Sequence, residues 1–289
     1  MLENKTVNKL VNHKKVFSLE IFPPQNASFQ NVYRTIEELK QVSPDFVSVT
    51  FGAGGSGLSP YTFEIASTIQ NDYGIESVAH LASIHLTKER VLEILNNLEE
   101  TNVKNVLALR GDYSEYTKEK RDFTYASDLI HFIKQHSDLN VLGACYPEGH
   151  YESHSLEKDV EYLKLKVDEG ISHLVTQLFL DNQKFYKFLE LTQKKSIHVP
   201  IEAGIMPVTS KKQLDKMISL SNATIPKKLE NLLIRYEHDP VSLKAAGTEY
   251  AIEQIIDLGS QGVDGIHLYT MNNVEITKQI YRETSYIFQ

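Results

Sequence analysis

The stretch Val16-Phe17-Ser18-Leu19-Glu20-Ile21 is the first of eight short runs that are rich in β-branched, aromatic and other apolar residues. Segments with apolar residues every three to four positions separate these runs, and this spacing predicts helices. Buried strands that alternate with helices are typical of a parallel sheet, and eight such units predict a closed (β/α)8 barrel of the α/β class. The predicted strands are residues 16–21, 46–51, 77–82, 105–109, 141–146, 173–179, 199–205 and 265–269. The predicted helices between them are residues 29–39, 61–73, 88–98, 125–135, 156–167, 184–192 and 211–218.

The connection between the seventh and eighth runs is longer than the others. It contains helical patterns at residues 226–236 and 241–258, and a last helix is predicted at 273–287. No Gly-, Pro- or Ser-rich linker and no change in composition divides the sequence, which argues against an open doubly wound sheet in two halves. We therefore expect one domain spanning residues 1–289, with residues 1–15 as an N-terminal extension and extra helix between strands seven and eight.

Composition narrows the class of protein. The 289 residues include 30 Lys+Arg and 38 Asp+Glu, and a net charge of −8 argues against a broad nucleic-acid-binding surface. A content of 41% hydrophobic and 24% charged residues is that of a globular protein rather than a disordered one. No run approaches the ~18 apolar residues of a membrane helix, and residues 1–15 lack the apolar core of a signal peptide. Cys145, the single cysteine, is expected in a buried strand. These features predict a cytoplasmic protein without membrane or nucleic-acid partners.

A carboxyl group near the end of the first run is the first functional candidate, because barrel enzymes carry their function at the C-terminal ends of the strands. Alternation places Glu20 on the same side as Ser18 and Phe22, in an otherwise apolar strand. Burial disfavours the charged form of a carboxyl group. Glu20 is therefore either paired with a buried Lys or Arg of the barrel or kept protonated near neutral pH. The second interpretation predicts a general acid.

A glycine-rich stretch, residues 52–57, follows the second run. It contains G-x-G-x-x-G, and Glu76 comes nineteen residues after the last glycine, as in a dinucleotide-binding fingerprint. Ser59 and Pro60 argue against that interpretation, because they suit the N-cap and first position of a helix that starts only after the glycines. We interpret the stretch as a loop that approaches a phosphate or a ring.

Polar residues also occur at the ends of the third, fourth and sixth runs. His80 lies in the third run, where a lone histidine is more often a satisfied core residue. Gly111, between Arg110 and Asp112, would let the backbone approach a ligand closely. Gln177 follows the sixth run, and its amide, which both donates and accepts hydrogen bonds, suits a heteroaromatic ligand.

A metal site is an alternative at the end of the fifth run, which continues as Tyr146-Pro147-Glu148-Gly149-His150. His150 and His154 are four residues apart and Glu148 is close to both. The set lacks a clear third ligand, however, and Gly149 weakens a helix there. We expect no metal.

Nine motifs in order along the sequence resemble those of the methylenetetrahydrofolate reductase family. The resemblance covers about residues 16–285, and the length resembles that of the stand-alone bacterial members, without the regulatory domain of the eukaryotic ones. The motifs are residues 19–24 (LEIFPP), 47–55 (VSVTFGAGG), 108–112 (ALRGD), 125–129 (YASDL), 146–150 (YPEGH), 164–170 (KLKVDEG), 176–181 (TQLFLD), 204–208 (GIMPV) and 269–272 (YTMN).

The resemblance implies a flavoprotein oxidoreductase of one-carbon metabolism and methionine biosynthesis, with FAD in the mouth of the barrel. In a ping-pong reaction, NADH or NADPH reduces the flavin and leaves, and 5,10-methylenetetrahydrofolate then enters and leaves as 5-methyltetrahydrofolate. Relatives commonly form homo-oligomers, so we expect self-association. The implied flavin contacts are Thr50, Phe51, Ala53, His80, Arg110, Gly111, Asp112, Ala126, Tyr146, His150, Asp159 and Lys166.

By the same resemblance, Glu20 is the acid that opens the five-membered ring of the folate, and Asp112, Gln177 and Gln213 contact the folate. Protonation of a ring nitrogen gives an iminium cation that accepts hydride, and an anion such as Asp112 would stabilise that cation and tune the flavin potential.

Two positions depart from the family pattern. Many relatives have an aromatic residue where Met217 stands, although Met can still cover a ring face. Relatives often have Arg where this sequence has Asn273, so the folate tail is expected to be held differently.

Two other functions remain open at this point. A flavin- or pterin-binding barrel without catalysis would have the same pocket, and a metal-dependent lyase would use Glu148, His150 and His154. The presence of Glu20 and Asp112 favours the reductase.

Overall fold

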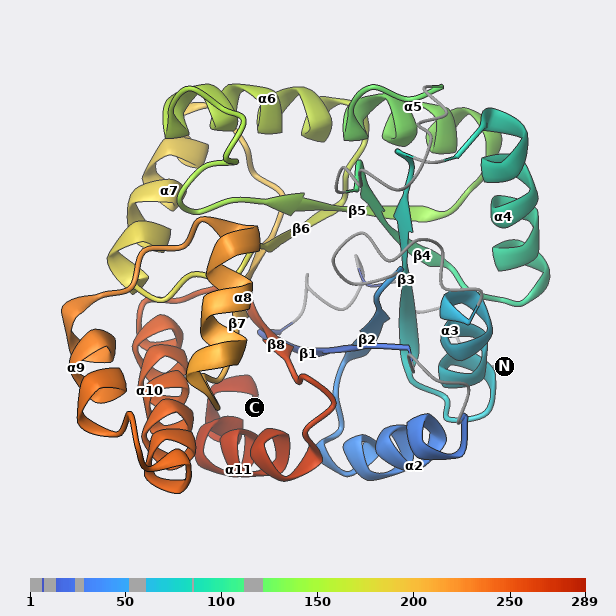
Figure 1. The fold of residues 1–289 in the computed structure, drawn as a ribbon. Coiled ribbons are helices and arrows are strands. Elements are labelled where there is room, and N and C mark those ends of the chain that lie inside the picture. Colours follow the sequence, from blue (N-terminus) through green and yellow to red (C-terminus); the bar gives the residue numbers. More distant parts are fainter. Residues whose placement is uncertain (1–6, 8–13, 24–28, 52–60, 85, 112–121) are drawn as a thin grey trace.

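The computed structural model of the protein describes residues 7, 14–23, 29–51, 61–84, 86–111 and 122–289. Eight parallel strands pair in chain order, and β8 pairs with β1 to close the barrel (Figure 1). The predicted (β/α)8 fold is therefore confirmed. The strands are β1 (Val16–Ile21), β2 (Phe46–Val49), β3 (Glu76–Ala82), β4 (Asn105–Leu109), β5 (Asn140–Cys145), β6 (His173–Thr176), β7 (Ile201–Ile205) and β8 (Gly265–Tyr269).

Helices surround the barrel, and three of them, α8 to α10, lie between β7 and β8, where extra helix was expected (Figure 1). Among the helices of the described residues, none is both long and apolar enough to cross a membrane. The helices are α2 (Phe29–Leu39), α3 (Thr62–Asn71), α4 (Lys88–Glu100), α5 (Ala126–His136), α6 (Leu156–Asp168), α7 (Asn182–Lys194), α8 (Lys211–Ser221), α9 (Lys227–Arg235), α10 (Pro240–Ser260) and α11 (Val274–Thr284), with 3-10 turns η1 (Lys40–Val42) and η3 (Ser285–Phe288).

Several boundaries differ from the sequence prediction, and those of β2, β6 and α3 are described here. Strand β2 ends at Val49 and β6 ends at Thr176, so the apolar runs continue past the last paired residues. Leu178 and Phe179 are buried although they lie beyond β6, which explains why hydrophobicity alone extended the strand. Helix α3 begins at Thr62, one residue after the start of the predicted helix 61–73, and the Thr62 hydroxyl donates to the carbonyl of Thr50. The predicted cap residues Ser59 and Pro60 lie outside the described residues.

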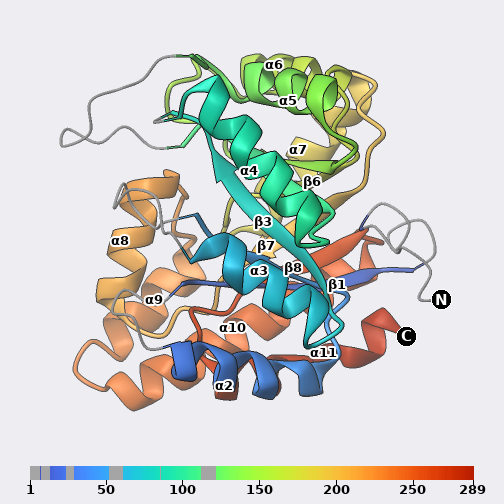
Figure 2. The same cartoon turned by 90° about the vertical axis from the view of Figure 1, so that its right-hand side faces the viewer.

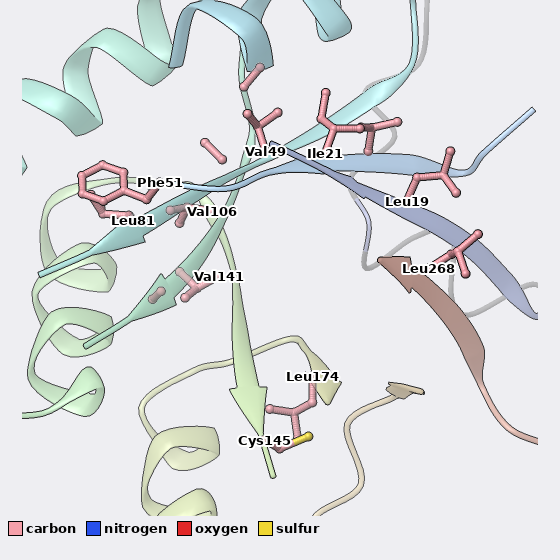
Figure 3. Close-up of a cluster of buried hydrophobic side chains, with 14 of the residues drawn as sticks. Leu19, Ile21, Val49, Phe51, Leu81, Val106, Val141, Cys145, Leu174 and Leu268 are labelled. Carbon is pink, nitrogen blue, oxygen red and sulfur yellow. The ribbon is translucent and has the colours of Figure 1, made fainter. Parts of the chain in front are cut away.

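The main core lies between the outer face of the barrel and the helices. Side chains from most strands contribute to it, including Leu19 and Ile21 of β1, Val49 of β2 and Leu268 of β8 (Figure 3). Complete burial of a Leu or Ile side chain contributes about 1.5–3 kcal/mol each, so this layer drives folding. Because β1 alternates, Leu19 and Ile21 face outward, and Ser18 and Glu20 therefore face the interior of the barrel.

The interior has an apolar layer at the end where the strands begin. It includes Val7, from the predicted N-terminal extension, which is completely buried and whose backbone N–H donates to Asn105 Oδ1 at 3.2 Å. The polar interior residues described below adjoin this layer, since His173 is paired with Leu142 and Glu202 with Val175. The other members of this layer are Val16, Phe46, Val78, Leu107, Leu142 and Val175.

A close approach of backbone to backbone fixes helix α10 against the exit of β7. A Cβ atom built on Gly247 would lie 1.8 Å from the carbonyl oxygen of Val208, so only glycine fits here. Val208 precedes α8, which lies at the end of the barrel opposite the C-terminus (Figure 2). Gly247 thus sets the position of a segment next to the barrel mouth.

We expect Gly247→Ala to lower the free energy of unfolding by about 1–3 kcal/mol, because the backbone must move to admit the methyl group. Gly259→Ala is the matched control on α10, since a Cβ there meets only side-chain atoms of Ile287, the nearest at 2.8 Å. That side chain can shift, so we expect a change below about 1 kcal/mol. Urea unfolding measures the free energy of unfolding of both variants. Equal losses would show that the contact of Gly247 with Val208 does not require glycine.

Candidate active site

Glu20 lies at the mouth end of β1 and is 8% exposed. Its partners in the neighbouring strands are Ser48 of β2 and Tyr269 of β8. Glu20 Oε2 lies 3.6 Å from His80 Nε2 and 3.8 Å from His267 Nε2. Among the described residues, the groups within ion-pair distance of Glu20 are thus histidines, and no buried pair of Glu20 with Lys or Arg is formed.

His80 is neutral at neutral pH. Burial lowers its pKa to about 4, and the nearby Glu20 only partly offsets this effect. Although His80 and Glu20 lie within ion-pair distance, the neutral imidazole does not act as a counterion. Its Nε2 atom is buried and has no hydrogen-bond partner among the described residues.

Side chains that follow β8 hold the backbone around Glu20. The Thr270 hydroxyl donates to the carbonyl oxygen of Glu20 at 2.7 Å. The Asn272 amide accepts from the N–H of Phe22 and donates to its carbonyl, both at 3.0 Å. Asn272 itself has a φ of 56°, a left-handed conformation that Asn tolerates better than most residues. The exits of β1 and β8 are therefore fixed to each other at the position of the acid.

Four polar residues form a connected set beneath Glu20, which we call the polar column: Ser18, His173, Glu202 and His267. His173 Nε2 lies 2.6 Å from Glu202 Oε1, and the Ser18 hydroxyl donates to Glu202 Oε2. Ser18 Oγ also lies 2.6 Å from His267 Nδ1. All four side chains are buried.

Sequence reasoning placed Ser18 beside Glu20 but missed the rest of the polar column and Tyr269. Two members of the polar column could have been noticed in the sequence, because Glu202 and His267, like Glu20, are polar residues inside apolar strand runs. Tyr269 donates to the carbonyl of Thr176 at 2.6 Å, and burial, with Glu20 nearby, raises its pKa well above the usual value.

A second group of predicted residues gathers at the ends of β4 and β5. Arg110 forms a two-point ion pair with Glu152, with N–O distances of 2.5 and 3.0 Å. The N–H of Glu152 donates to His150 Nδ1, and the ring of His150 packs edge-on against Tyr146. Burial and the charge of Arg110 lower the pKa of His150.

Lys166 and Asp159 lie on α6 beside this group. Lys166 Nζ donates to the carbonyl of Ala144 at 2.6 Å, and burial lowers its pKa. Asp159 accepts from the Ser153 hydroxyl at 2.8 Å. Both residues act electrostatically on His150, so the structure brings Asp159, Lys166 and Arg110 around one histidine.

The remaining predicted flavin contacts lie at strand exits or a helix start. Phe51 packs against Phe63 at the exit of β2, and Ala126 is the first residue of α5. Gly111 has a φ of +92°, and a Cβ there would lie 3.0 Å from the Ile84 side chain, so the position requires glycine. Ala53 and Asp112, together with the glycine-rich loop, lie outside the described residues.

The predicted folate contacts come from β6 and α8. Gln177 directly follows β6, and its backbone N–H donates to the carbonyl of Cys145 at 2.7 Å. Gln213 accepts two hydrogen bonds from Thr209 through Oε1. Met217 lies one turn further along α8 and is half-buried against a small apolar cluster. Asn273, one of the two departures, caps α11 by accepting from the N–H of Ile276.

The carboxylate of the proposed metal set has another role. Glu148 accepts from both the backbone N–H and the hydroxyl of Thr224, which ties the end of β5 to the segment after α8. Among the described residues, no three His, Cys, Asp or Glu side chains are arranged to hold a metal ion. Cys145 is buried as expected, and burial raises the pKa of its thiol.

Unpartnered polar atoms mark where a ligand would fit. Five buried side-chain nitrogen or oxygen atoms of the described residues lack a hydrogen-bond partner, and three of them belong to predicted ligand contacts. Buried polar atoms are rarely left unsatisfied, so a bound molecule is the natural source of the missing partners. The three atoms are Thr50 Oγ1, His80 Nε2 and Gln213 Nε2.

The low pKa of His80 predicts a pH dependence of stability. The unfolded state takes up a proton on this histidine below about pH 6.5, whereas the folded state does so only near pH 4, so the free energy of unfolding falls as the pH falls between these values. Between pH 7 and pH 5, the free energy of unfolding of the wild type should fall by about 2 kcal/mol more than that of His80→Asn. Urea unfolding at each pH measures this difference. His198→Asn, at an exposed site, should behave as the wild type does. Parallel pH profiles for wild type and His80→Asn would contradict this.

The chain is similar to known proteins over most of its length. The sequence model of the methylenetetrahydrofolate reductase family matches residues 5–285. The 5,10-methylenetetrahydrofolate reductase of Pectobacterium carotovorum subsp. carotovorum is 33% identical over 264 residues, 91% of this chain and 88% of that protein. Methylenetetrahydrofolate reductase 1 of Schizosaccharomyces pombe is 33% identical over 286 residues, 96% of this chain but 47% of that protein. This chain thus spans about half of the yeast relative.

A solved structure from Clostridium thermocellum, described as binding two copies of 5-methyl-5,6,7,8-tetrahydrofolic acid, has the same fold. It superposes with a TM-score of 0.65 over 97% of this chain and 99% of that one, at 17% identity. That identity supports the fold alone. The match of the family model over nearly the whole sequence, with relatives one-third identical, establishes that this chain belongs to the methylenetetrahydrofolate reductase family, whose members are oxidoreductases.

Proposed function

We propose that this protein reduces 5,10-methylenetetrahydrofolate to 5-methyltetrahydrofolate, with FAD as cofactor and NADH or NADPH as hydride donor, in a ping-pong reaction. The observation that carries the proposal is Glu20: a buried carboxyl group at the barrel mouth, faced by a neutral histidine and by no Lys or Arg among the described residues. A carboxyl group in this position is placed to donate a proton to a substrate. Self-association and a cytoplasmic location stay predictions from the sequence.

The residues at the mouth fit a flavin. Thr50 Oγ1 and His80 Nε2 are buried and unpartnered, and the flavin ring carries carbonyl oxygens and ring nitrogens that could satisfy them. Arg110, after β4, and Lys166, on α6, would supply positive charge for the phosphates of the dinucleotide, with Arg110 exchanging its partner Glu152 for a phosphate. When bound, FAD supplies the chemistry of hydride acceptance from a nicotinamide and hydride delivery to the folate.

Glu20 has the central role in the folate step. Its carboxyl proton passes to a nitrogen of the five-membered folate ring, the carbon–nitrogen bond opens, and an iminium cation forms that can accept hydride. Glu20 is left as a carboxylate beside this cation and takes up a proton again from solvent afterwards. His80 helps by remaining neutral, since an imidazolium next to the iminium would repel it.

The other residues bind and orient the folate. We assign Gln177 and Gln213 to hydrogen bonds with the pterin ring, because a carboxamide pairs with its alternating donors and acceptors. The free Nε2 of Gln213 supports this assignment. Met217, one turn along α8, would cover the ring face. Asp112 is the proposed anion opposite the cation.

We predict that FAD, not FMN, is bound. Asp159 and Lys166 lie beyond the residues assigned to the flavin ring, near Arg110, where an adenylate would need them. Heat release and chromatography should yield FAD, and recovery of FMN alone would contradict the prediction. Lys166→Gln should weaken FAD binding about tenfold. Lys164→Gln, on the same helix but paired with Asp168, should leave it unchanged.

A further prediction separates the effect of Glu20 on folate reduction from its effect on flavin reduction by NADH. Glu20→Gln keeps the side-chain size but cannot donate a proton, so folate reduction should fall by at least about 10²-fold. Bleaching of the flavin by NADH needs no such acid and should stay within about tenfold of the wild type. Stopped-flow spectroscopy on protein with full flavin occupancy measures each step.

Glu76→Gln is the matched control, because Glu76 starts β3 at the other end of the barrel and accepts from Asn105. It should leave both half-reactions close to the wild-type rates. A wild-type rate of flavin reoxidation by methylenetetrahydrofolate in Glu20→Gln would show that the acid lies elsewhere. Bound flavin that NADH does not bleach, even in the wild type, would favour a non-catalytic binding protein.

A further inference from the structure

The turn after β5 holds Glu148 in a constrained position. The N–H of Gly149 donates to the carbonyl of Tyr146 at 3.0 Å, which closes a turn over residues 146–149. Pro147 occupies the second position of this turn, where its fixed φ is favoured. Glu148 comes next, and its side chain is 11% exposed. The backbone that carries this carboxylate therefore has little freedom to move.

Both oxygens of Glu148 accept hydrogen bonds from Thr224, which follows α8 in the sequence. Oε1 accepts from the backbone N–H of Thr224 at 3.0 Å, and Oε2 accepts from its hydroxyl. Lys184 of α7 lies nearby, with Nζ 4.0 Å from Oε2. Hydrogen bonds to a charged acceptor are about twice as strong as those between neutral groups. The Glu148–Thr224 contact is therefore a strong link between the exit of β5 and the segment after α8.

The Glu148–Thr224 contact joins segments on either side of β6. The strands pair in the order β5, β6 and β7, and α8 belongs to the connection that follows β7. Gln177 directly follows β6, whereas Gln213 and Met217 lie on α8. The position of α8 relative to β5 and β6 thus decides whether these three predicted folate contacts can meet one molecule.

Helix α8 has few buried side chains to fix its position. Among its described side chains, Leu214 and Ser221 are buried, and the others are half-buried or exposed. Leu214 belongs to a small apolar cluster, against which Met217 packs. At its C-terminal end, the left-handed residue Asn222 ends the helix, and Thr224 follows two residues later. A helix with so little buried surface depends on restraints at its ends, and the Glu148–Thr224 contact is one of them.

We propose that Glu148 is a positioning residue for the folate substrate. Through Thr224 it holds α8 beside the barrel mouth, so that Gln213 and Met217 contact the folate together with Gln177. The inference rests on the proposed function, in which these three residues bind the folate. Loss of Glu148 should therefore weaken folate binding and leave hydride transfer to bound folate nearly unchanged. Loss of the acid, in contrast, should slow the reaction even when folate is saturating.

The test measures the folate half-reaction by stopped-flow spectroscopy at several concentrations of methylenetetrahydrofolate, on protein with full flavin occupancy. In Glu148→Ala, which removes both acceptors, the half-saturating concentration should rise about tenfold, and the limiting rate should stay within about threefold of the wild type. Thr224→Val removes the hydroxyl donor and should raise the half-saturating concentration about threefold. Glu148→Gln retains an acceptor for the Thr224 N–H and should lie closer to the wild type than Glu148→Ala does.

Glu237→Ala is the matched control, because Glu237 pairs with Lys211 at the other end of α8. The two side chains are 3.5 Å apart and more than half exposed, so their pairing should contribute little. Hydrogen–deuterium exchange supplies a readout that is independent of activity. Amides of residues 211–221 should exchange faster in Glu148→Ala and Thr224→Val, and at the wild-type rate in Glu237→Ala. The amides of α4 should be unaffected in all variants.

The outcomes separate the inference from the proposed function. A wild type that does not reduce methylenetetrahydrofolate would overturn the proposed function and the inference with it. With an active wild type, unchanged half-saturating concentrations in Glu148→Ala and Thr224→Val would overturn the inference alone. A rise without faster exchange in α8 would show that the effect does not pass through this helix, and it would also overturn the inference. So would an equal rise in Glu237→Ala.

Discussion

The pairing of β8 with β1 is the interaction on which the site depends. It closes the barrel, and its register places Ser18 opposite His267 and Glu20 opposite Tyr269. The same junction is reinforced beyond the strands, where Thr270 and Asn272 hold the backbone of Glu20 and Phe22. Residues about 250 positions apart in the sequence thus share one rigid edge. A proton donor gains from this, because its reach to a substrate atom is set by backbone hydrogen bonds rather than by a mobile loop.

The fold could be predicted because each strand is buried on both faces and each helix on one, so the two periodicities alternate along the sequence. The ends of the strands could not be predicted in this way, because hydrophobicity indicates burial and not the pairing of strands. Leu178 and Phe179 are as apolar and as buried as residues of β6, but they lie past its last hydrogen bond. The start of α3 at Thr62 lies one residue after the start of the predicted helix 61–73, a difference within the uncertainty of any helix boundary.

The site was predicted unevenly, and the reason is physical. Glu20 could be singled out because a single strand with period-two alternation shows that a carboxyl group faces the interior. The polar column could not be assembled in this way. Contacts such as those of Glu202 with Ser18 and of His267 with Glu20 depend on the stagger between strands around a closed barrel. The sequence of a single strand does not reveal this stagger. Ala53 and Asp112 lie outside the described residues.

Val7 fills part of the barrel interior at the end where the strands begin. Completely buried and hydrogen-bonded to Asn105, it belongs to the apolar layer of the barrel interior. Because the described interior is filled at this end, the mouth is the side from which a ligand would reach Glu20. In the reaction proposed above, the nicotinamide and the folate would then have to enter by that mouth in turn, so a hydrophobic side chain far from the reacting atoms would bear on the order of the two steps.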